Sequence, residues 1–417
     1  MTIHHHFLDE IETLLEPNES IEELVRLGVL DLELRLQESD TSMLSGEVMK
    51  SRPLKFEKWG AHRIPLALDF GGSFIKLAFI DPENGCILKH HSLAVKRTIV
   101  DKRLFQDVVD WICQQIDVFL GESGTICPID YVMGVTFSFP LDLNGGLTTM
   151  GKGFILTDEL KGAKVTELLQ WHFDQTVGSR DASFSVLVSG IVNDSVAVYL
   201  ANAVTNAQKN NISLILGTGI NACFSIPASR LPARKLPADA KPLDTVLINS
   251  ELGFLGQRFI NLTGFDCTSE PHMPLEFVTS GRWIPQTLYN ILKSYHLLPK
   301  VISGLEFDGK LVCGILDGSK TSLFDETQQD VQEITRFLIK RAAIYATAAL
   351  LSILHFTGST QSGVVRIGYV GSFLQHCYEY KNLIQEFSQG RLELVFLEHS
   401  NLIGAFVNSE MKLRVQF

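Results

Sequence analysis

The hydrophobic and polar positions of this chain alternate between a helical and a strand period. From Phe7 to Glu38 the apolar residues recur at helical spacing among glutamates, which predicts short amphipathic helices, the first ending at Pro17. The apolar stripe of these helices is expected to dock on the body of the protein. The polar residues 39–60 predict a linker that leads to a strand beginning near Ile64.

Beyond this linker, apolar strands and amphipathic helices follow one another. The first half predicts a hairpin turning at residues 81–85, a helix over 103–120 and a strand at 131–139. The second half predicts a long helix over 331–354 and strands at 213–217, 245–249, 364–371 and 392–398. This alternation is typical of an α/β protein.

Length and composition support a globular protein of more than one domain. A chain of 417 residues is too long for one ordinary core, and its 45% of hydrophobic residues can fill two. The formal net charge of −11 disfavours a nucleic-acid or anionic-membrane surface as the partner. We therefore expect neither nucleic-acid binding nor membrane insertion, and the oligomeric state is left open between monomer and homodimer.

Cysteine usage and the N-terminus indicate the cytosol. The seven cysteines are an odd number without a CxxC pair, which suits buried thiols in a reducing compartment better than disulfides or zinc. No targeting segment is visible, and the longest apolar stretch, residues 342–354, is too short to span a bilayer. The residues His4 to His6 could bind a metal, but a solvated or cloning-derived tail is the preferred interpretation.

An apolar run at residues 66–80, LALDFGGSFIKLAFI, is interrupted by an acid, two glycines and a serine. Successive backbone N–H groups in a tight glycine turn form a concavity that attracts phosphate. Asp69 beside this turn would repel a phosphate unless a cation intervened, as in a Mg²⁺-nucleotide. A similar turn, LGTG, follows the strand at 213–217. Each turn alone is more often structural, so neither predicts a site by itself.

The combination of several short segments is more specific. In order, the chain contains the hairpin of residues 66–80 and then GVTFSFP (134–140), GKGF (151–154), VNDSVA (192–197), LGTGIN (216–221), INSELG (248–253) and LEFVTSG (275–281). In their order and approximate spacing, these segments resemble the eukaryotic hexokinases over nearly the whole chain. The resemblance implies the two-domain α/β fold of the actin-like ATPases (ribonuclease H-like), with a central cleft that holds the sugar and ATP-Mg²⁺.

The resemblance also implies site residues. The sugar-binding and catalytic positions fall on Ser138, Lys152, Asn193, Asp194, Asn221, Glu251 and Glu276. The nucleotide-binding positions fall on Asp69, Gly71, Gly72, Ser73, Lys76, Gly217, Thr218, Gly219, Gly371 and Ser372. No side chain is expected to ligate a resident metal, because Mg²⁺ arrives with ATP and reaches Asp69 through water. The expected domains are an N-terminal helical segment with linker (1–58), a small domain (59–193) and a large domain (194–417).

The residue types suit this chemistry. A selective hexose pocket needs carboxylates, amides and a hydroxyl, because every sugar hydroxyl both donates and accepts hydrogen bonds. A carboxylate must also accept the proton of the attacking hydroxyl, and Asp194 is the predicted general base. Its alternative role is to cap a helix. Lys152 can offset charge on the phosphoryl group or be an exposed loop lysine. Glu251 and Glu276 could instead be surface acids.

The chain also departs from the family pattern. Phe74 and Lys76 replace the usual Asn and Arg after the hairpin turn, and Gly151 replaces a threonine before Lys152. The residues PHMP (271–274) precede Glu276 in place of a glycine-glutamine pair. Near the end, Val370 replaces an acid before Gly371-Ser372, and EHSNLIGA (398–405) replaces an acid-glycine-serine-glycine stretch, so the adenosine site differs most.

Two classes of function follow from these features. The favoured one is an ATP-dependent hexokinase that phosphorylates the 6-hydroxyl of a glucose-like hexose, or a relative that acts on an N-acetylhexosamine. The alternative is a hexokinase-like regulator that binds sugar with little or no turnover, which the altered adenosine site would suit. An actin- or Hsp70-like ATPase machine is disfavoured, because such proteins have no use for the sugar-binding segments.

Overall fold

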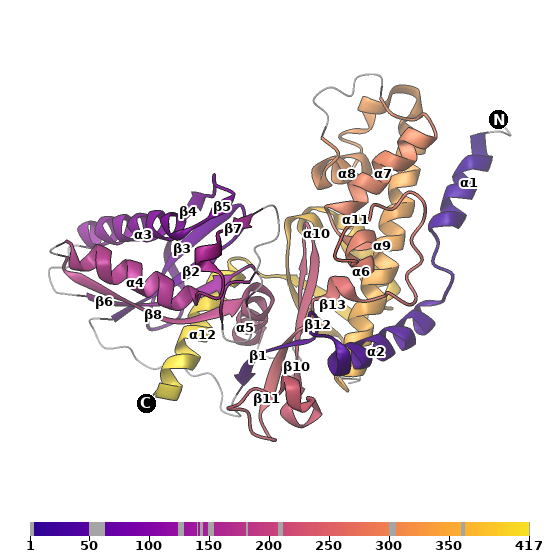
Figure 1. The fold of residues 1–417 in the computed structure, drawn as a ribbon. Coiled ribbons are helices and arrows are strands. Elements are labelled where there is room, and N and C mark those ends of the chain that lie inside the picture. The colour runs from indigo at the N-terminus through magenta and orange to yellow at the C-terminus, as the bar shows by residue number, and fades with distance from the viewer. Residues whose placement is uncertain are drawn as a thin grey trace. The chain divides into compact units, whose positions relative to one another are not determined.

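The computed structural model divides the chain into two compact units (Figure 1). Unit 1 consists of Met1–Ser51 and Gln208–Glu398, and unit 2 of Arg52–Ala207 and His399–Phe417. Each unit contains one large β-sheet with helices packed on it, which confirms the α/β class. The structure describes residues 4–49, 63–123, 129–139, 141, 145–148, 154–180, 182–206, 212–299, 306–359 and 363–416.

Unit 2 is built on a five-stranded sheet of order β4-β3-β2-β6-β8, with β5 and β7 paired separately. Its strands are β2 (Arg63–Phe70), β3 (Phe74–Ile80), β4 (Ile87–Ala94), β5 (Ile99–Val100), β6 (Ile129–Phe137), β7 (Ile155–Leu156) and β8 (Phe184–Asn193). Its helices are α3 (Lys102–Ser123), η1 (Asp158–Leu160), α4 (Val165–Gly178), α5 (Asp194–Asn206) and α12 (Ser400–Gln416).

Alternation along the strands gives this sheet two different faces. Leu66 and Leu68 of β2 are fully buried in the core cluster that also contains residues of α3 and α4. The opposite face of β6 meets α12: a Cβ on Gly134 would come 2.0 Å from the carbonyl oxygen of Ala405. Only a glycine allows this close approach of α12 to the sheet.

Unit 1 is built on a six-stranded sheet of order β1-β11-β10-β9-β12-β13. Its strands are β1 (Leu44–Met49), β9 (Ile212–Leu216), β10 (Ile220–Pro227), β11 (Thr245–Asn249), β12 (Val365–Val370) and β13 (Leu392–Phe396). Its helices are α1 (His4–Leu15), α2 (Ile21–Glu38), η2 (Ala228–Arg230), η3 (Ala233–Lys235), η4 (Leu252–Phe254), α6 (Pro274–Thr279), α7 (Trp283–Ser294), α8 (Gly309–Leu316), η5 (Thr321–Thr327), α9 (Gln328–Phe356), α10 (Ser372–His376) and α11 (Tyr378–Phe387).

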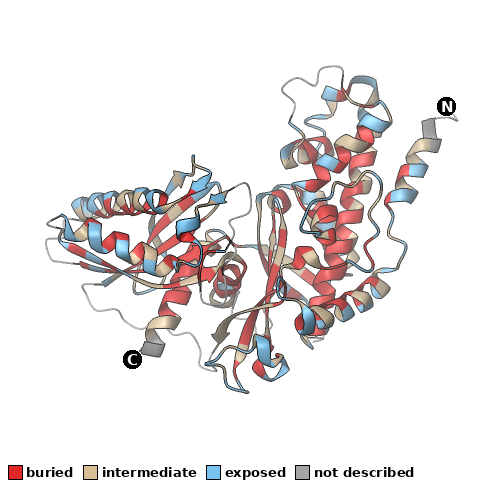
Figure 2. Cartoon of the chain, viewed as in Figure 1, coloured by how far each residue is buried: buried red, intermediate tan, exposed pale blue. Residues whose placement is uncertain are grey.

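The long helix α9 forms the centre of the helical part of unit 1, and it is buried over most of its length (Figure 2). Helix α2 packs against it, with Gly28 over Ser352, whose hydroxyl donates a 3.1 Å hydrogen bond to the carbonyl of Val25. Within the described ranges, Thr321–Phe356 is the one helical stretch long and apolar enough to cross a membrane, and 83% of its apolar window is buried inside the protein. Its apolarity is therefore accounted for by packing.

Most predicted elements are confirmed. The two N-terminal helices form as α1 and α2, and residues 81–85 join β3 to β4, with the amide of Asp81 donating to the carbonyl of Cys86 at 2.8 Å. The predicted helices at 103–120 and 331–354 are α3 and α9. The predicted strands beginning near 64 and at 131, 213, 245, 364 and 392 are β2, β6, β9, β11, β12 and β13.

The predicted linker at residues 39–60 is wrong in its described part. Residues 44–49 form β1, which pairs antiparallel with β11 at the edge of the unit 1 sheet, with Leu44 opposite Asn249 and Met49 opposite Thr245. The segment LSGEVM is too polar to predict a buried strand, and an edge strand needs only one neighbour. Residues 50–60 lie outside the described part of the chain.

The division into units differs from the expected boundaries in three places. The N-terminal residues belong to unit 1 through the packing of α2 on α9, while α5 and α12 belong to unit 2. Helices α5 and α12 pack closely, because a Cβ on Gly404 would come 2.0 Å from the carbonyl oxygen of Ala197. The last helix of the chain therefore completes the unit that β2 begins.

The six described cysteines are free thiols. Cys113, Cys223 and Cys377 are buried as expected, but Cys86 is exposed beside the turn of the β3–β4 hairpin. Burial raises the pKa of the Cys113 thiol to about 12, so this thiol stays protonated at neutral pH. The seventh cysteine, Cys127, lies outside the described residues.

Candidate active site

In unit 2, parallel strands bring three predicted segments to one edge of the sheet. Strands β2, β6 and β8 are mutually parallel, with Phe70 opposite Phe137 and Phe137 opposite Asn193. All three strands therefore end at the same edge, where polar residues follow each one. The chain continues there into the turn at 71–73, into Ser138 and into Asp194.

The interrupted run at residues 66–80 is the hairpin of β2 and β3, as predicted. A Cβ on Gly71 would come 2.7 Å from the carbonyl oxygen of Phe74, so the turn requires a glycine here. Asp69, at the end of β2, is 5% exposed and lies opposite Lys76 on β3. The Nζ of Lys76 is 4.0 Å from the Asp69 carboxylate, so a cation of the chain itself stands beside this acid.

A second partner of Asp69 comes from the far end of the chain. The Nδ2 of Asn401 donates a 3.2 Å hydrogen bond to Asp69, and the hydroxyl of Thr136 donates to the carbonyl of Asn401 at 2.8 Å. Asn401 lies in the stretch 398–405, which the sequence assigned to the adenosine side. It was missed as a partner of the hairpin, because no local pattern links residues 332 positions apart.

Asp194 lies where β8 ends and α5 begins, and its side chain is half-buried. The backbone N–H of Ser195 donates to the carboxylate of Asp194 at 2.8 Å and to the side-chain oxygen of Asn193 at 2.9 Å. The Ser195 hydroxyl donates to the same Asn193 oxygen at 2.7 Å. These bonds orient the carboxylate at the N-terminus of α5.

The remaining predictions in unit 2 concern Ser138 and Lys152. The amide of Ser138 donates a 3.3 Å hydrogen bond to the carbonyl of Phe70, so Ser138 lies beside the hairpin that starts at Gly71. Lys152 and its neighbours 151 and 153 lie outside the described residues. The role of Lys152 therefore stays a prediction.

In unit 1, a second sheet edge collects the other predicted residues. Strand β9 is parallel to β12, and β11 runs in the same direction because both β9 and β11 are antiparallel to β10. Strands β9, β12 and β11 end at Leu216, Val370 and Asn249. Three segments therefore follow the strands at this edge: the turn at 217–219, Gly371-Ser372 and Ser250-Glu251.

Asn221, Asn249 and Glu251 form a hydrogen-bonded chain at this edge. The Nδ2 of Asn221 donates to Asn249 at 2.9 Å, and the Nδ2 of Asn249 donates to the Glu251 carboxylate at 2.8 Å. Glu251 has a left-handed backbone (φ 47°), which places it at the end of the strand in a conformation uncommon for a non-glycine residue. The arrangement presents amide and carboxylate groups held by one another, as a polyol pocket requires.

Asn249 was not among the predicted residues, although it lies inside INSELG. The signal that could have identified it is a polar residue at the end of the apolar strand TVLIN. In the structure its side chain is buried, and Asn249 is 6% exposed. It acts through its neighbours, because its amide accepts from Asn221 and donates to Glu251. We infer that Asn249 is a positioning residue.

On the predicted sugar-binding role of Asn221 and Glu251, replacing Asn249 with alanine is expected to raise the sugar KM about tenfold with a smaller change in kcat, because both residues lose the partner that orients them. Steady-state kinetics over a range of sugar concentrations measures this split. The matched control is Asn290→Ala on α7, because among the described residues its side-chain amide donates only to the carbonyl of Phe265 and the sulfur of Cys267. Equal changes in both variants, or an unchanged KM in Asn249→Ala, would contradict the assignment.

Glu276 on α6 joins the predicted sugar-binding residues to the turn at 217–219. Its carboxylate accepts from the backbone N–H of Ile220 at 3.3 Å and from the indole N–H of Trp283 at 3.5 Å. A Cβ on Gly219 would come 2.6 Å from a carboxylate oxygen of Glu276. Gly219 therefore leaves the space that this carboxylate occupies. The sequence did not identify Trp283 as its partner.

The turn at 217–219 is packed against two other turns. The amide of Gly281 donates to the carbonyl of Gly217 at 2.8 Å, and a Cβ on Gly371 would come 2.3 Å from the carbonyl oxygen of Leu216. Gly371 also has φ 120°, a conformation that side chains rarely allow. These three turns therefore pack so closely on one another that Gly371 has no room for a side chain.

The structure thus distributes the predicted residues over two sheet edges, one in each unit. Unit 2 carries Asp69, Gly71, Gly72, Ser73, Lys76, Ser138, Asn193 and Asp194. Unit 1 carries Gly217, Thr218, Gly219, Asn221, Glu251, Glu276, Gly371 and Ser372. Each edge holds a glycine turn together with carboxylate and amide groups.

Two models of known protein families match this chain, one over each half. Residues 7–204 match one family model described as hexokinase, and residues 211–408 match a second model with the same description. N-acetylglucosamine kinase 1 of Candida albicans is 25% identical over 421 residues, which cover 82% of this chain and 82% of that protein. Hexokinase-3 of Homo sapiens is 31% identical over 166 residues, which cover 38% of this chain and 17% of that longer protein.

Solved structures confirm the fold. The hexokinase of Schistosoma mansoni, determined with glucose, aligns with a TM-score of 0.75 at 20% identity and covers 98% of this chain and 99% of its own. A second hexokinase crystal structure gives 0.73 at 19% identity, with 97% and 99% covered. These alignments confirm the prediction of a two-domain α/β fold of the actin-like ATPase kind.

Proposed function

Because the chain belongs to the hexokinase family and is an ATP-dependent sugar kinase, we propose that it transfers the γ-phosphate of ATP to the 6-hydroxyl of a hexose, with Asp194 as the general base. The observation that supports this role is the half-buried carboxylate of Asp194, fixed by the Ser195 amide at the end of β8. A carboxylate held in this way can align the attacking hydroxyl and accept its proton as the bond to phosphorus forms.

We propose that each unit by itself offers groups that bind sugar hydroxyls. Unit 2 offers Ser138 and Asn193, and unit 1 offers Asn221, Glu251 and Glu276, which are the hydroxyl, amide and carboxylate groups that suit a polyol. The hydrogen-bonded chain through Asn249 supports this assignment, since it fixes two of these groups before any sugar binds.

We place the phosphates of ATP against the glycine turns. The turns at 71–73 and 217–219 are rich in glycine, and successive backbone N–H groups of such a turn suit a phosphate group. When bound with ATP, Mg²⁺ would offset charge on the transferred phosphoryl group. Lys76 lies beside Asp69 and gives the hairpin a cation of its own. Contact of Asp69 with Mg²⁺ through water stays a prediction.

A second candidate substrate is an N-acetylhexosamine. A relative that aligns with 82% of this chain is named N-acetylglucosamine kinase 1, and the segment before Glu276 differs from the family pattern. In this segment the terminal methyl of Met273 would lie 2.5 Å from a Cβ on Gly253, next to Glu276. An apolar methyl beside the hydroxyl-binding carboxylate suits an acetyl group better than a further hydroxyl.

ADP release with a panel of sugars tests the proposal. Glucose, mannose, N-acetylglucosamine and N-acetylmannosamine are compared by kcat/KM, and ³¹P–¹H correlation spectra of the product locate the phosphate. Sugar-dependent ADP release with phosphate on the 6-oxygen is the expected result. Binding of sugar without ADP release would instead favour the regulatory alternative, and phosphate on another oxygen would refute the role of the 6-hydroxyl.

We further propose the cytosol as the compartment, because the six described cysteines are free thiols and the exposed Cys86 would face an oxidant elsewhere. The expected partners are a hexose and ATP. The oligomeric state is left open between monomer and homodimer.

A further inference from the structure

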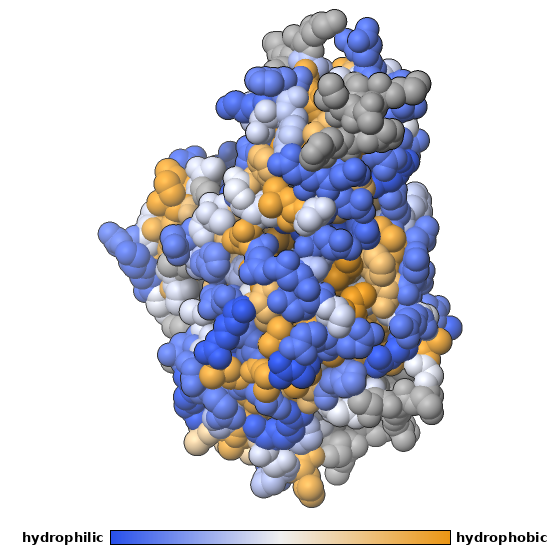
Figure 3. Space-filling model, turned by 90° about the vertical axis from the view of Figure 1, so that its right-hand side faces the viewer, coloured by the Kyte–Doolittle hydropathy of each residue, from blue (hydrophilic) through white to orange (hydrophobic). Residues whose placement is uncertain are grey.

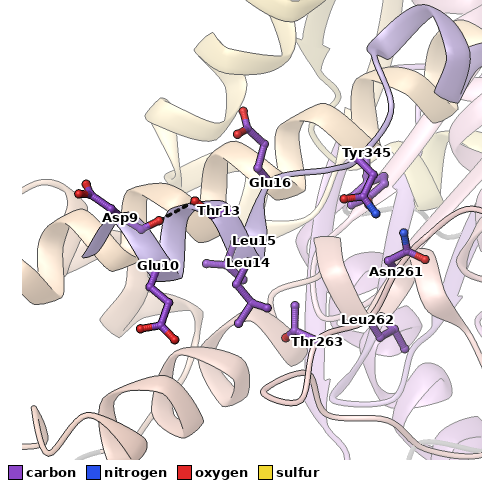
Figure 4. A pocket seen from close by; sticks show the side chains of 11 residues that line it. Asp9, Glu10, Thr13, Leu14, Leu15, Glu16, Asn261, Leu262, Thr263 and Tyr345 are labelled. Atoms are coloured by element: carbon purple, nitrogen blue, oxygen red, sulfur yellow. Dashed lines mark hydrogen bonds between the residues drawn. The ribbon is translucent and has the colours of Figure 1, made fainter. Parts of the chain in front are cut away.

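A hollow of about 910 Å³ lies beside α1 in unit 1, and Leu14, Leu262 and Tyr345 are among the residues that line it (Figure 4). Its acids Asp9 and Glu10 are exposed neighbours on one helix and point to different sides of it. Figure 3 views the molecule from the side on which α1 and α2 lie, and hydrophilic residues there surround smaller apolar patches. Polar groups that converge on one point are typical of a ligand site, and these two acids do not converge.

Two thiols of unit 1 lie against each other where α8 meets α10. Cys313 lies on α8, and Cys377 directly follows the last residue of α10. The thiol of Cys377 donates a hydrogen bond to the sulfur of Cys313. The two sulfur atoms are therefore neighbours, although the residues are far apart in the sequence.

The packing of the two helices accounts for this contact. A Cβ on Gly309 would come 2.9 Å from the ring of Phe373, so a glycine allows α8 to approach α10 closely. Cys313 lies one helical turn after Gly309. Cys377 lies one turn after Phe373, whose carbonyl accepts from the N–H of Cys377 at 3.0 Å. Each cysteine thus follows the contact by one turn of its own helix, and the same packing holds the thiols together.

The two thiols differ in exposure and in acidity. Cys313 is half-buried, whereas Cys377 is 2% exposed. The hydrogen bond from Cys377 lowers the pKa of the Cys313 thiol and outweighs burial and the charges of Asp317 and Asp308, which raise it. The same hydrogen bond and then burial raise the pKa of Cys377. The more exposed thiol is thus the more acidic one, as expected of a cysteine that reacts with oxidants through its thiolate.

We propose that Cys313 and Cys377 form a reversible intramolecular disulfide when the protein meets a peroxide. The Cys313 thiolate attacks one peroxide oxygen and becomes a sulfenic acid, and the released hydroxide takes up a proton to give water. The sulfur of Cys377 then attacks the sulfenic sulfur, and the thiol proton leaves with the sulfenic hydroxyl as a second water. The two thiols lose two electrons in total, and the peroxide gains them.

The disulfide would tie the end of α10 to α8 within unit 1. Neither cysteine is among the residues assigned above to sugar or ATP, so this inference does not depend on the proposed reaction. Disulfides of proteins in a reducing compartment are usually transient and redox-sensing, which agrees with the free thiols of the structure and with a link that forms only on oxidation.

Peroxide titration of the 417-residue protein, followed by peptide mapping, tests the proposal. After the remaining thiols are blocked, trypsin releases the segments 311–320 and 367–381, which carry Cys313 and Cys377. Mass spectrometry should find these two peptides joined with the loss of two hydrogen atoms, and dithiothreitol should separate them again. The same titration in urea is the control, because unfolding separates α8 from α10 and should remove the cross-link.

Three variants assign the roles of the thiols. Cys313→Ser should lose the cross-link, whereas Cys267→Ser should keep it. Cys267 is the matched control because it is half-buried in the same unit, and its sulfur accepts from the side-chain amide of Asn290 at 3.3 Å. Cys377→Ala should leave the sulfenic acid of Cys313 without a partner, so that dimedone labels it. Circular dichroism confirms that each variant is folded.

The proposal is overturned if Cys313 and Cys377 remain thiols at peroxide concentrations that oxidise the exposed Cys86, or if Cys313 is joined to another cysteine. Equal yields of the cross-link in native and urea-unfolded protein would show that the fold does not bring the thiols together. Absence of the dimedone label in folded Cys377→Ala would refute Cys313 as the thiol that the peroxide oxidises first.

Discussion

Asp194→Ala should lower kcat for sugar phosphorylation by at least about a hundredfold while the sugar dissociation constant changes little, because proton removal from the attacking hydroxyl is needed only in the transition state. The other proposed sugar-binding residues, among them Ser138 and Asn193 of the same unit, are unchanged in this variant. Single-turnover kinetics measures the chemical step, and calorimetric titration with sugar measures the binding.

The structure supplies a matched control for this experiment. Asp101 also precedes a helix, α3, and its carboxylate accepts from the backbone N–H of Leu104 at 2.9 Å, as that of Asp194 accepts from Ser195. Asp101→Ala should cost about 0.5–2 kcal/mol of stability through the lost cap and leave kcat unchanged. If the two variants lose the same amount of stability and neither loses kcat, Asp194 is only a helix cap.

Local patterns in the sequence were sufficient to predict most of the helices and strands. The hairpin at 66–80 and the long helix α9 followed from hydrophobic periodicity, and the glycine turns marked where strands end. Because β2 and β6 are parallel, predicting their ends was enough to place the turn at 71–73 and Ser138 on one edge. Strand β8, which brings Asp194 to the same edge, was not predicted. Fold class and much of each sheet edge were therefore predictable.

Contacts between distant segments were not predictable in this way. Asn401 reaches Asp69 only because α12 packs on the unit 2 sheet, over Gly134 and against α5. Nothing in the local pattern of α12 says which sheet it covers, so its assignment to the large domain differed from the structure. The edge strand β1 was not predicted for a related reason. Its residues pair with β11 about 200 positions away and bury little apolar surface of their own.

The second large effect concerns the ion pair that ties α9 to the loop before α6. The guanidinium of Arg341 bonds the carboxylate of Asp266 at 3.0 and 2.5 Å, and their side chains are only 3% and 0% exposed. The backbone N–H and hydroxyl of Thr263 also donate to Asp266, at 2.7 and 2.9 Å. Every oxygen of this buried carboxylate therefore depends on donors that the fold holds in place.

Arg341→Met should lower the free energy of unfolding by about 3–5 kcal/mol at neutral pH, because the Asp266 charge is left buried without a cation. The double variant Arg341→Met/Asp266→Leu should recover much of this loss, since it removes the charge together with its partner. Urea unfolding followed by circular dichroism measures all three proteins. The control is Arg26→Met, because Arg26 and Glu23 form an exposed pair that should change stability little.

The effect of pH follows from the pKa of Asp266. Burial would raise this pKa, but the hydrogen bonds and charge of Arg341 and the Thr263 donors outweigh burial and lower it. In the native protein the pair therefore contributes stability above the pKa of the unfolded chain (about 3.9) and loses it as pH falls through the lower folded value. Without Arg341, burial dominates and Asp266 takes up a proton on folding, so the variant's deficit should be largest at neutral pH and shrink as pH falls towards 4. A deficit that stays constant between pH 7 and pH 4 would show that Arg341 acts through packing and not through its charge.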